Sequence, residues 1–185
     1  MKLMKLTKLT QKIENLAAKS GLLYRFAKGY YINVIKKEAV LANITHDDNL
    51  LCVGGGTCPF SAILFHQVTG AKVTVIDNNS LCVPKARRVI KQLGLEKHVS
   101  VFCKDGTEAD YAGYTVIHLA LQVSPMESVF TQAEKLSAPG TRLLIRRPKK
   151  HLNCLYCKSF KNLLSRSPYT THKSRSIGST LLYTK

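Results

Sequence analysis

Long apolar runs are missing from this sequence of 185 residues. No stretch of about 18 apolar residues occurs, which excludes a membrane-spanning helix of ordinary length. The first eight residues, MKLMKLTK, interleave lysines with leucines and lack the continuous apolar segment of a secretory signal peptide. The six cysteines mostly fall inside apolar runs, which is typical of reduced, buried thiols rather than of a disulfide framework. We therefore expect a cytoplasmic protein with one substantial core.

Acidic residues are also few, with 11 Asp and Glu against 28 Lys and Arg and a formal net charge of +17. Residues 1–45 hold nine basic and two acidic residues, and residues 46–145 hold nine of each. Residues 146–185 hold ten basic residues and no acidic one. Excess positive charge favours polyanions such as RNA. The basic ends therefore leave two alternatives open, an RNA-binding surface or solvated lysine-rich helices.

Internal repeats and low-complexity segments are absent, and apolar runs alternate with helical patterns instead. Apolar residues at helical spacing predict an amphipathic helix over residues 1–19, which ends at Ser20-Gly21. The further expected helices cover residues 30–42, 59–68, 81–93, 126–136 and 152–164, and the expected strands cover 50–53, 72–76, 98–103, 115–120, 141–146 and 177–183. This alternation predicts an α/β fold with a Rossmann-like, doubly wound, mostly parallel sheet of about seven strands and short N-terminal helices. A helical segment, residues 1–46, would precede the sheet domain, residues 47–185.

A glycine turn in the middle of the chain is the strongest functional signal. An apolar run enters Gly54, Gly55 and Gly56, a helical pattern follows, and a second apolar run ends on Asp77, which lies 23 positions after Gly54. Glycines let the backbone turn tightly against a ligand, and an acidic residue at this distance accepts hydrogen bonds from ribose hydroxyls. The pattern predicts that these four residues bind an adenosine-bearing cofactor.

The loop favours S-adenosylmethionine over NAD. A dinucleotide site has the pattern G-x-G-x-x-G, but the third glycine position is Pro59 here. A proline at a helix start removes one N–H donor that would otherwise bind a pyrophosphate. S-adenosylmethionine carries a sulfonium and no phosphate, so it needs less from that helix end. We therefore include Pro59 in the predicted site for S-adenosylmethionine.

Residues 50–147 resemble the class I S-adenosylmethionine-dependent methyltransferase fold, with a glycine loop after the first strand and Asp105-Gly106 after the third. The resemblance implies that Asp105 and Gly106 lie at the adenine and that Asn78, after the second strand, belongs to the cofactor site. One departure is Cys52, which stands where an acidic residue often precedes the glycine loop.

Three segments within residues 30–147 show a narrower resemblance, to nicotianamine synthases and their bacterial metallophore relatives. Residues 54–61 are similar to that family's G-x-G-x-x-P-hydrophobic-Ser/Thr loop, and residues 31–38 to its Tyr-x-Asn-x-x-x-x-Glu segment. Residues 138–146 are similar to its block at the fifth strand. About 45 residues precede the expected sheet in this sequence, so we do not expect them to form the long N-terminal helical domain of that family.

The two resemblances imply different chemistry at the sulfonium. A methyltransferase leaves S-adenosylhomocysteine, whereas a nicotianamine-synthase-like enzyme transfers the aminobutyryl group to an amine and leaves methylthioadenosine. Both reactions are in-line displacements in which positioning supplies most of the rate. An amine acceptor must lose a proton, and the resemblance implies Glu38 as the base with Tyr31 beside it. Seven positions apart on a helix, these two side chains can face one cleft.

The predicted function is therefore an S-adenosylmethionine-dependent transferase that moves a methyl or an aminobutyryl group to a small-molecule acceptor such as an amine or an amino acid. Two alternatives remain open at this point: an RNA methyltransferase, and a basic RNA-binding module without catalysis.

Other motifs carry less weight. Cys154 and Cys157 form one CxxC near His151, and a single pair does not supply the four ligands of a zinc site. His118 interrupts an apolar strand, where a histidine is more often part of the core than catalytic. The basic run over residues 146–150 either neutralises a phosphate or carboxylate at the cleft edge or lies in a solvated loop.

Overall fold

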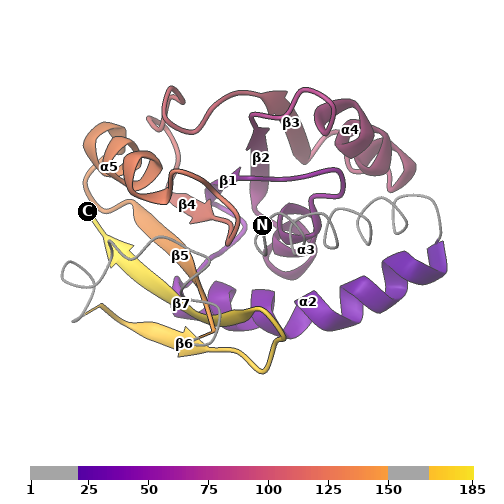
Figure 1. The fold of residues 1–185 in the computed structure, drawn as a ribbon, viewed down its shortest axis with the longest axis horizontal. Coiled ribbons are helices and arrows are strands. Elements are labelled where there is room, and N and C mark those ends of the chain that lie inside the picture. Colours follow the sequence, from indigo (N-terminus) through magenta and orange to yellow (C-terminus); the bar gives the residue numbers. More distant parts are fainter. Residues whose placement is uncertain (1–20, 150–166) are drawn as a thin grey trace, which may run out of the picture.

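The computed structural model describes residues 21–149 and 167–185. These residues form an α/β fold in which one mixed sheet is covered by helices on both faces (Figure 1). The elements in chain order are α2 (Gly21–Leu41), β1 (Asn49–Val53), α3 (Phe60–Thr69), β2 (Lys72–Asp77), α4 (Val83–Gln92), β3 (Val99–Cys103), β4 (Val116–Leu119), α5 (Met126–Leu136), β5 (Arg142–Pro148), β6 (Tyr169–Thr171) and β7 (Ile177–Thr184).

The sheet has seven strands in the order β3-β2-β1-β4-β5-β7-β6. The first five strands pair in parallel, and β7 pairs antiparallel with both β5 and β6. The predicted Rossmann-like, mostly parallel sheet is therefore confirmed. Its strand order reverses between β1 and β4, and this is the point at which open α/β sheets bind their ligands.

Two elements differ from the expectation. Helix α2 begins at Gly21 rather than near residue 30, so one long helix replaces the expected shorter one. Strand β6 was not expected, because three residues, Tyr169–Thr171, are too few to show an alternating pattern. The helices predicted over residues 1–19 and 152–164, and the CxxC pair, lie outside the described residues.

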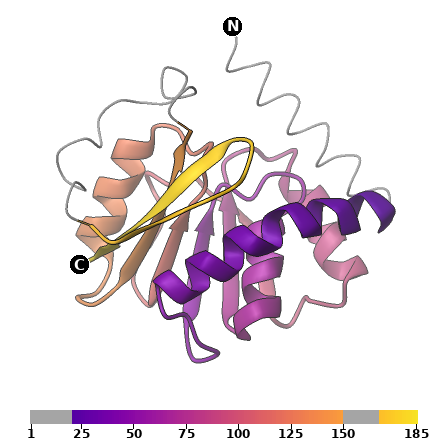
Figure 2. The same ribbon diagram turned by 90° about the horizontal axis from the view of Figure 1, so that it is seen from below.

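Each face of the sheet carries its own core. One core joins β1, β2 and β3 to apolar side chains of α2, α3 and α4, and its fully buried members include Ile35, Leu50 and Phe65. The other core packs α5 against the opposite side of β1, β4 and β5 and surrounds the buried ring of Tyr111. Figure 2 shows α2 lying across the strands on one side of the sheet and α5 on the other side. Strand residues alternate between the two cores, as the two-residue period of a strand requires.

The end of α2 is bound to the sheet by Arg142 of β5. Its guanidinium donates to the carbonyl oxygens of Ala42 and Asn43, at 2.6 and 2.9 Å, and forms an ion pair with Asp48. Asp48 also accepts hydrogen bonds from the Thr45 backbone N–H at 2.8 Å and from the Thr115 hydroxyl at 2.6 Å. A cation suits the C-terminal end of a helix, where carbonyl groups lack intrahelical partners. These contacts fix the position of α2 above the sheet.

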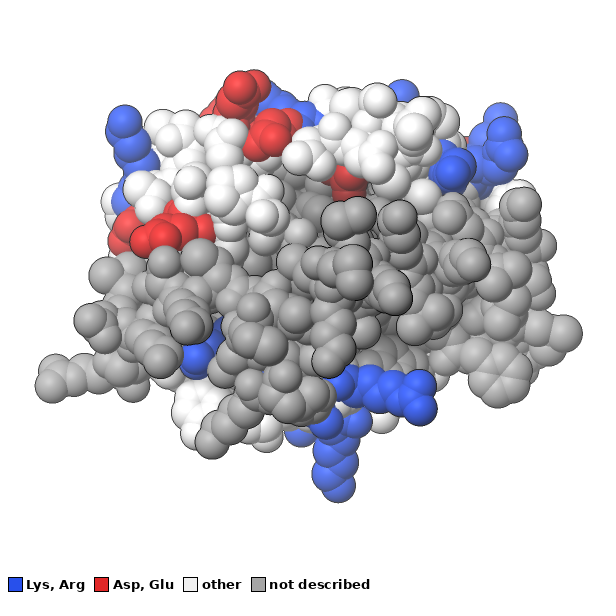
Figure 3. Space-filling view, viewed as in Figure 1, with Lys and Arg blue, Asp and Glu red and all other residues white. Residues whose placement is uncertain are grey.

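The four cysteines among the described residues are free thiols; Cys52, Cys58 and Cys82 are buried, and Cys103 is exposed. No helix in the described part of the chain is long and apolar enough to cross a membrane. On the face shown in Figure 3, acidic side chains lie in the upper half, whereas the charged side chains along the lower edge are Lys or Arg. Lys36 and Lys37 of α2 lie with Lys173 around a shallow groove.

Candidate functional site

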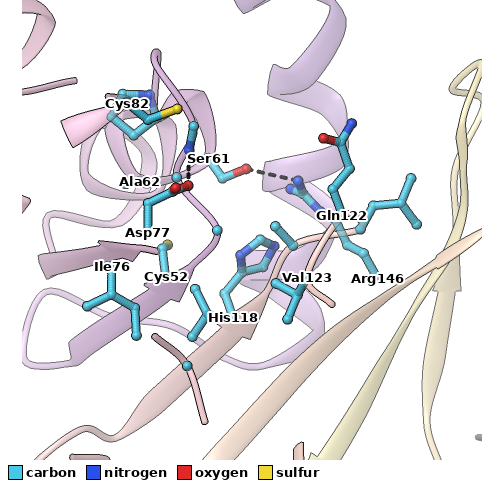
Figure 4. A pocket seen from close by; sticks show the side chains of 18 of the residues that line it. Cys52, Ser61, Ala62, Ile76, Asp77, Cys82, His118, Gln122, Val123 and Arg146 are labelled. Atoms are coloured by element: carbon cyan, nitrogen blue, oxygen red, sulfur yellow. Dashed lines mark hydrogen bonds between the residues drawn. The ribbon is translucent and has the colours of Figure 1, made fainter. Parts of the chain in front are cut away.

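A cavity of about 360 Å³ opens at the carboxyl ends of the parallel strands, at the strand-order reversal between β1 and β4. Pockets that hold small ligands in proteins have about this size. Figure 4 shows Asp77 on one side of the cavity, Arg146 on the other and Ser61 between them in this view. The cavity therefore has two ends: one at Asp77, which we call the nucleotide end after its predicted ligand, and a second end at Arg146.

The glycine loop forms one wall because its backbone has a shape that other residues would not allow. Gly54 and Gly56 have φ values of +85° and +62°, which L side chains rarely adopt. A Cβ on Gly55 would lie 2.3 Å from Cγ1 of Val75, so this glycine is needed for close packing on β2. Pro59 stands directly before α3, where its missing N–H costs no helical hydrogen bond. The loop thus exposes backbone rather than side chains to the cavity.

Asp77, at the end of β2, fixes this loop from the opposite side. Its Oδ2 accepts a hydrogen bond from the Gly56 backbone N–H at 2.7 Å, and its Oδ1 accepts one from the Asn79 N–H at 2.9 Å. A carboxylate has about four lone-pair positions, so Asp77 retains capacity for hydroxyl donors from a ligand. The predicted ribose acceptor therefore lies in the cavity wall and also shapes the loop.

Asn78, Asp105 and Gly106 line the same end of the cavity. The Asn78 amide donates to Asp105 Oδ2 at 3.1 Å, and Thr107 donates its backbone N–H and its hydroxyl to Oδ1 at 2.8 and 2.7 Å. These hydrogen bonds lower the pKa of Asp105, which keeps it ionised. A Cβ on Gly106 would lie 3.0 Å from Val53 and 3.1 Å from Val129, so a side chain would not fit without movement. The structure brings all eight predicted cofactor-binding positions, namely Gly54, Gly55, Gly56, Pro59, Asp77, Asn78, Asp105 and Gly106, around one space.

The second end of the cavity combines aromatic and polar side chains. Tyr31 lines it, and its ring stacks on Phe60 with centroids 5.8 Å apart. Arg146 lines it too and donates from Nη1 to the Ser61 hydroxyl at 2.9 Å (Figure 4). The expectation that Tyr31 faces the cleft therefore agrees with its position.

Glu38 does not line the cavity. Its side chain is fully buried and accepts two hydrogen bonds from Arg146, at 2.8 and 2.7 Å, and a third from the Thr180 hydroxyl at 2.6 Å. Burial alone raises the pKa of Glu38, but the charge and hydrogen bonds of Arg146, with smaller contributions from His118 and Thr180, lower it from 4.5 to about 2. A carboxylate with so low a pKa binds a proton only weakly at neutral pH. Glu38 therefore contacts Arg146, which lines the cavity, but does not line the cavity itself.

His118 is a fully buried residue that also lines the cavity. Neither of its ring nitrogens has a hydrogen-bond partner among the described residues, although Nε2 lies 3.8 Å from Glu38 Oε2. Burial, aided by the positive charge of Arg146 and opposed by Glu38, lowers the pKa of His118 to about 3, so the imidazole is neutral. Buried polar atoms usually have partners, so two orphan nitrogens at a cavity wall suggest a ligand.

The sequence did not reveal that His118 and Arg146 would share one cavity. They lie on β4 and β5, on the face of the sheet that α2 covers. The sequence offered the basic run over residues 146–150, expected either at the cleft edge or in a solvated loop, and a histidine within an apolar strand. Burial of that face by α2 could not be predicted from local pattern. No cluster of possible metal ligands occurs in the described part of the chain.

No known family model matches the sequence. Over 126 residues, 66% of the chain, it is 27% identical to the L-histidine 2-aminobutanoyltransferase of Yersinia pestis. That stretch covers 47% of the Yersinia protein, so the chain spans about half the length of this curated relative.

Solved structures share this fold over most of the chain. One of them is a glutamate-to-glutamine variant of the nicotianamine synthase MtNAS in complex with S-adenosylmethionine. The match covers 96% of this chain and 74% of the MtNAS chain, with a TM-score of 0.80 and 22% sequence identity. Another is an RNA methyltransferase from Salinibacter ruber in complex with S-adenosyl-L-homocysteine. This match covers 82% of this chain and 90% of the methyltransferase chain, with a TM-score of 0.65 and 22% sequence identity. The chain therefore has the fold shared by S-adenosylmethionine-dependent methyltransferases and nicotianamine synthase, as its resemblance to both families predicted.

Proposed function

We propose that this protein is an S-adenosylmethionine-dependent transferase that moves the aminobutyryl group of the cofactor to the amine of a small molecule. One observation carries the proposal: a single cavity joins a ribose-type carboxylate and glycine loop at one end to polar side chains at the other. The identity to an L-histidine 2-aminobutanoyltransferase favours aminobutyryl over methyl transfer.

The nucleotide end fits an adenosine moiety. Asp77 would accept hydrogen bonds from the ribose hydroxyls, while Asn78 and Asp105 would form hydrogen bonds with the edge of the adenine ring. The crowded positions of Gly55 and Gly106 indicate that the wall is built for backbone approach. When bound, S-adenosylmethionine supplies an electrophilic carbon next to its sulfonium. The protein needs no phosphate site for this ligand, in agreement with Pro59 in place of the third glycine.

The reaction is a nucleophilic substitution at carbon. The lone pair of a neutral acceptor amine forms a C–N bond to the aminobutyryl carbon on sulfur, and the C–S electron pair stays on sulfur. The products are neutral methylthioadenosine and a secondary ammonium that carries the aminobutyryl group. An acceptor that arrives as an ammonium first loses one proton to a base or to solvent.

We assign Tyr31 and His118 to the acceptor amine. The neutral imidazole of His118 has a lone pair that accepts a hydrogen bond from an amine N–H, which would orient the nitrogen toward the electrophilic carbon. Tyr31, stacked on Phe60, would close the cavity above it. We place Glu38 behind Arg146 as a positioning residue rather than as the base, because its carboxylate is already bound by three donors.

Mass spectrometry of the products tests the proposal. The purified protein is incubated with S-adenosylmethionine and L-histidine, with other amino acids and simple amines in parallel. We expect methylthioadenosine together with an aminobutyryl adduct of one acceptor. S-adenosylhomocysteine in place of methylthioadenosine would overturn aminobutyryl transfer and favour a methyltransferase.

A further inference from the structure

Arg146 has more hydrogen-bond donors than its contacts with Glu38 and Ser61 use. A guanidinium carries five N–H groups in a fixed plane. Nε and Nη2 each donate to Glu38, and Nη1 donates to Ser61. These three bonds use three of the five N–H groups, and the other two are one on Nη1 and one on Nη2. Because Arg146 is 5% exposed and its side chain lines the cavity, these two N–H groups are within reach of a ligand bound there.

The surroundings of Arg146 hold it in a fixed orientation. Glu38 binds it through two oxygens, Thr180 of β7 binds Glu38 at 2.6 Å, and Ser61 at the start of α3 accepts from Nη1. Three elements besides β5 therefore restrain one guanidinium. A planar group restrained in this way presents its remaining N–H groups without further loss of side-chain entropy.

Charge limits which anion can bind here. Arg146 is the one fixed cation among the described lining residues at this end of the cavity, since Lys104 lies beside Asp105 at the nucleotide end. Glu38 already offsets its charge. A doubly charged phosphate would therefore be poorly compensated, whereas a carboxylate needs two N–H donors and carries a single delocalised charge. The site thus suits a carboxylate better than a phosphate.

We propose that Arg146 and Ser61 form a carboxylate-binding position at the second end of the cavity and that an α-amino acid group binds there. This inference rests on the proposed function, which places S-adenosylmethionine in the same cavity. The carboxylate has two chemical sources, the aminobutyryl part of the cofactor or an amino-acid acceptor. In either case Arg146 contacts the bound ligand directly, and Glu38 positions it.

Two pairs of ligands, each with one member that lacks the carboxylate, show which of these two sources binds Arg146. Calorimetry compares S-adenosylhomocysteine with methylthioadenosine, which lacks the whole amino-acid part. Kinetics compare L-histidine with histamine, which lacks the carboxylate alone. The variant Arg146→Lys keeps the positive charge beside Glu38 but loses the planar fork. We expect it to reduce, by about tenfold to a hundredfold, the preference for the carboxylate-bearing member of one pair, because hydrogen bonds to a charged group are worth that factor.

Controls distinguish recognition from folding. Ser61→Ala leaves the Glu38–Arg146 pair intact and should change the same preference in the same direction by a smaller factor. Arg147→Lys makes the same exchange one position along β5, at a residue that does not line the cavity, and it should leave the preference unchanged. Equal effects of Arg146→Lys on both members of each pair, or an equal loss of preference in Arg147→Lys, would overturn the proposal. The calorimetric comparison tests Arg146 even if the protein forms no methylthioadenosine. A failure of the proposed reaction can therefore be told apart from a failure of the carboxylate-binding proposal.

Discussion

Asp77 is the residue on which we expect cofactor binding to depend most. Its carboxylate holds the glycine loop through Gly56 and would also bind the ribose. We expect Asp77→Ala to weaken binding of S-adenosylmethionine by about 1–3 kcal/mol, the usual scale for a lost hydrogen bond to a charged group. Calorimetry measures this change, with Glu96→Gln on the exposed surface as the matched control for charge. Unchanged affinity in Asp77→Ala would mean that the cofactor binds elsewhere.

A substitution of Glu38 distinguishes two mechanisms, one in which it positions Arg146 and one in which it is the base. A buried ion pair that loses one partner leaves an uncompensated charge, so we expect Glu38→Gln to lower the free energy of unfolding by about 3–5 kcal/mol. The residual enzyme should show a raised KM for the carboxylate-bearing ligand and the same pH profile of kcat. Denaturant unfolding and pH-dependent kinetics measure both effects. A stable variant that has lost turnover and the acidic limb of its pH profile would instead show that Glu38 is the base.

The sequence was sufficient to predict that eight positions share this end of the cavity: the glycine loop and Asp77 follow from backbone shape and spacing, and the family resemblance implied Asn78, Asp105 and Gly106. It was not sufficient for Glu38. The helical spacing between Tyr31 and Glu38 suggested a shared cleft, but the two side chains have different surroundings. Arg146, the partner of Glu38, lies 108 positions away in the sequence, and no local pattern predicts that contact. The role predicted for Tyr31 at the acceptor stays a prediction, and for Glu38 we propose a positioning role in place of the predicted base.

The glycine loop is the element whose shape can be tested most directly. We expect Gly55→Ala to lower the free energy of unfolding by about 1–3 kcal/mol, because its Cβ would meet Cγ1 of Val75 at 2.3 Å. Cofactor affinity should fall with it, since the loop must move to relieve the overlap. Denaturant unfolding and calorimetry report the two changes.

Gly29 offers a matched control within α2. A Cβ there meets no atom within 4 Å, and alanine is favoured over glycine inside a helix by about 0.5–1 kcal/mol. Gly29→Ala should therefore stabilise the protein slightly and leave binding unchanged. If Gly55→Ala behaved like Gly29→Ala, the close packing of the loop on β2 would be disproved.

At the level of elements, the sequence predicted the strands that carry a clear apolar run and the helices between them. It missed the first part of α2 because Ser20-Gly21 resembles a helix end and residues 22–29 show no clean apolar face. It missed β6 because an edge strand of three residues is defined by its partner β7 rather than by its own pattern. Long-range pairing, not propensity, decides such elements.

The whole molecule should lose stability in acid. Burial holds the pKa of His118 near 3 in the folded protein, whereas an unfolded histidine titrates near 6.5. The unfolded chain therefore binds more protons than the folded chain between these values, and stability falls as the pH drops through that range. Glu38, with its pKa near 2 against 4.5, adds a further loss below pH 4.5.

We expect a combined loss on the order of a few kcal/mol between pH 7 and pH 3. Urea unfolding at a series of pH values measures it. His118→Gln should flatten the part of the curve between about pH 6.5 and pH 4.5, because glutamine does not titrate. Identical slopes in the variant and the parent protein over that range would contradict a buried neutral histidine.

On the same scale, the sequence predicted the fold class but not how the charged surfaces meet. The basic groove at Lys36, Lys37 and Lys173 brings part of the C-terminal region to α2. The predicted RNA association, the division of the chain at residue 46 and the cytoplasmic location stay predictions. They depend on surfaces and partners rather than on the core that the apolar pattern specifies.

The most direct test of the central proposal is the identity of the nucleoside product. The protein, with Asp77→Ala as the control, is incubated with S-adenosylmethionine and an amino-acid acceptor, and the products are resolved by mass spectrometry. We predict methylthioadenosine and an aminobutyryl adduct from the parent protein, at levels that fall in the variant. S-adenosylhomocysteine, or methylthioadenosine at equal levels with Asp77→Ala, would contradict aminobutyryl transfer in this cavity.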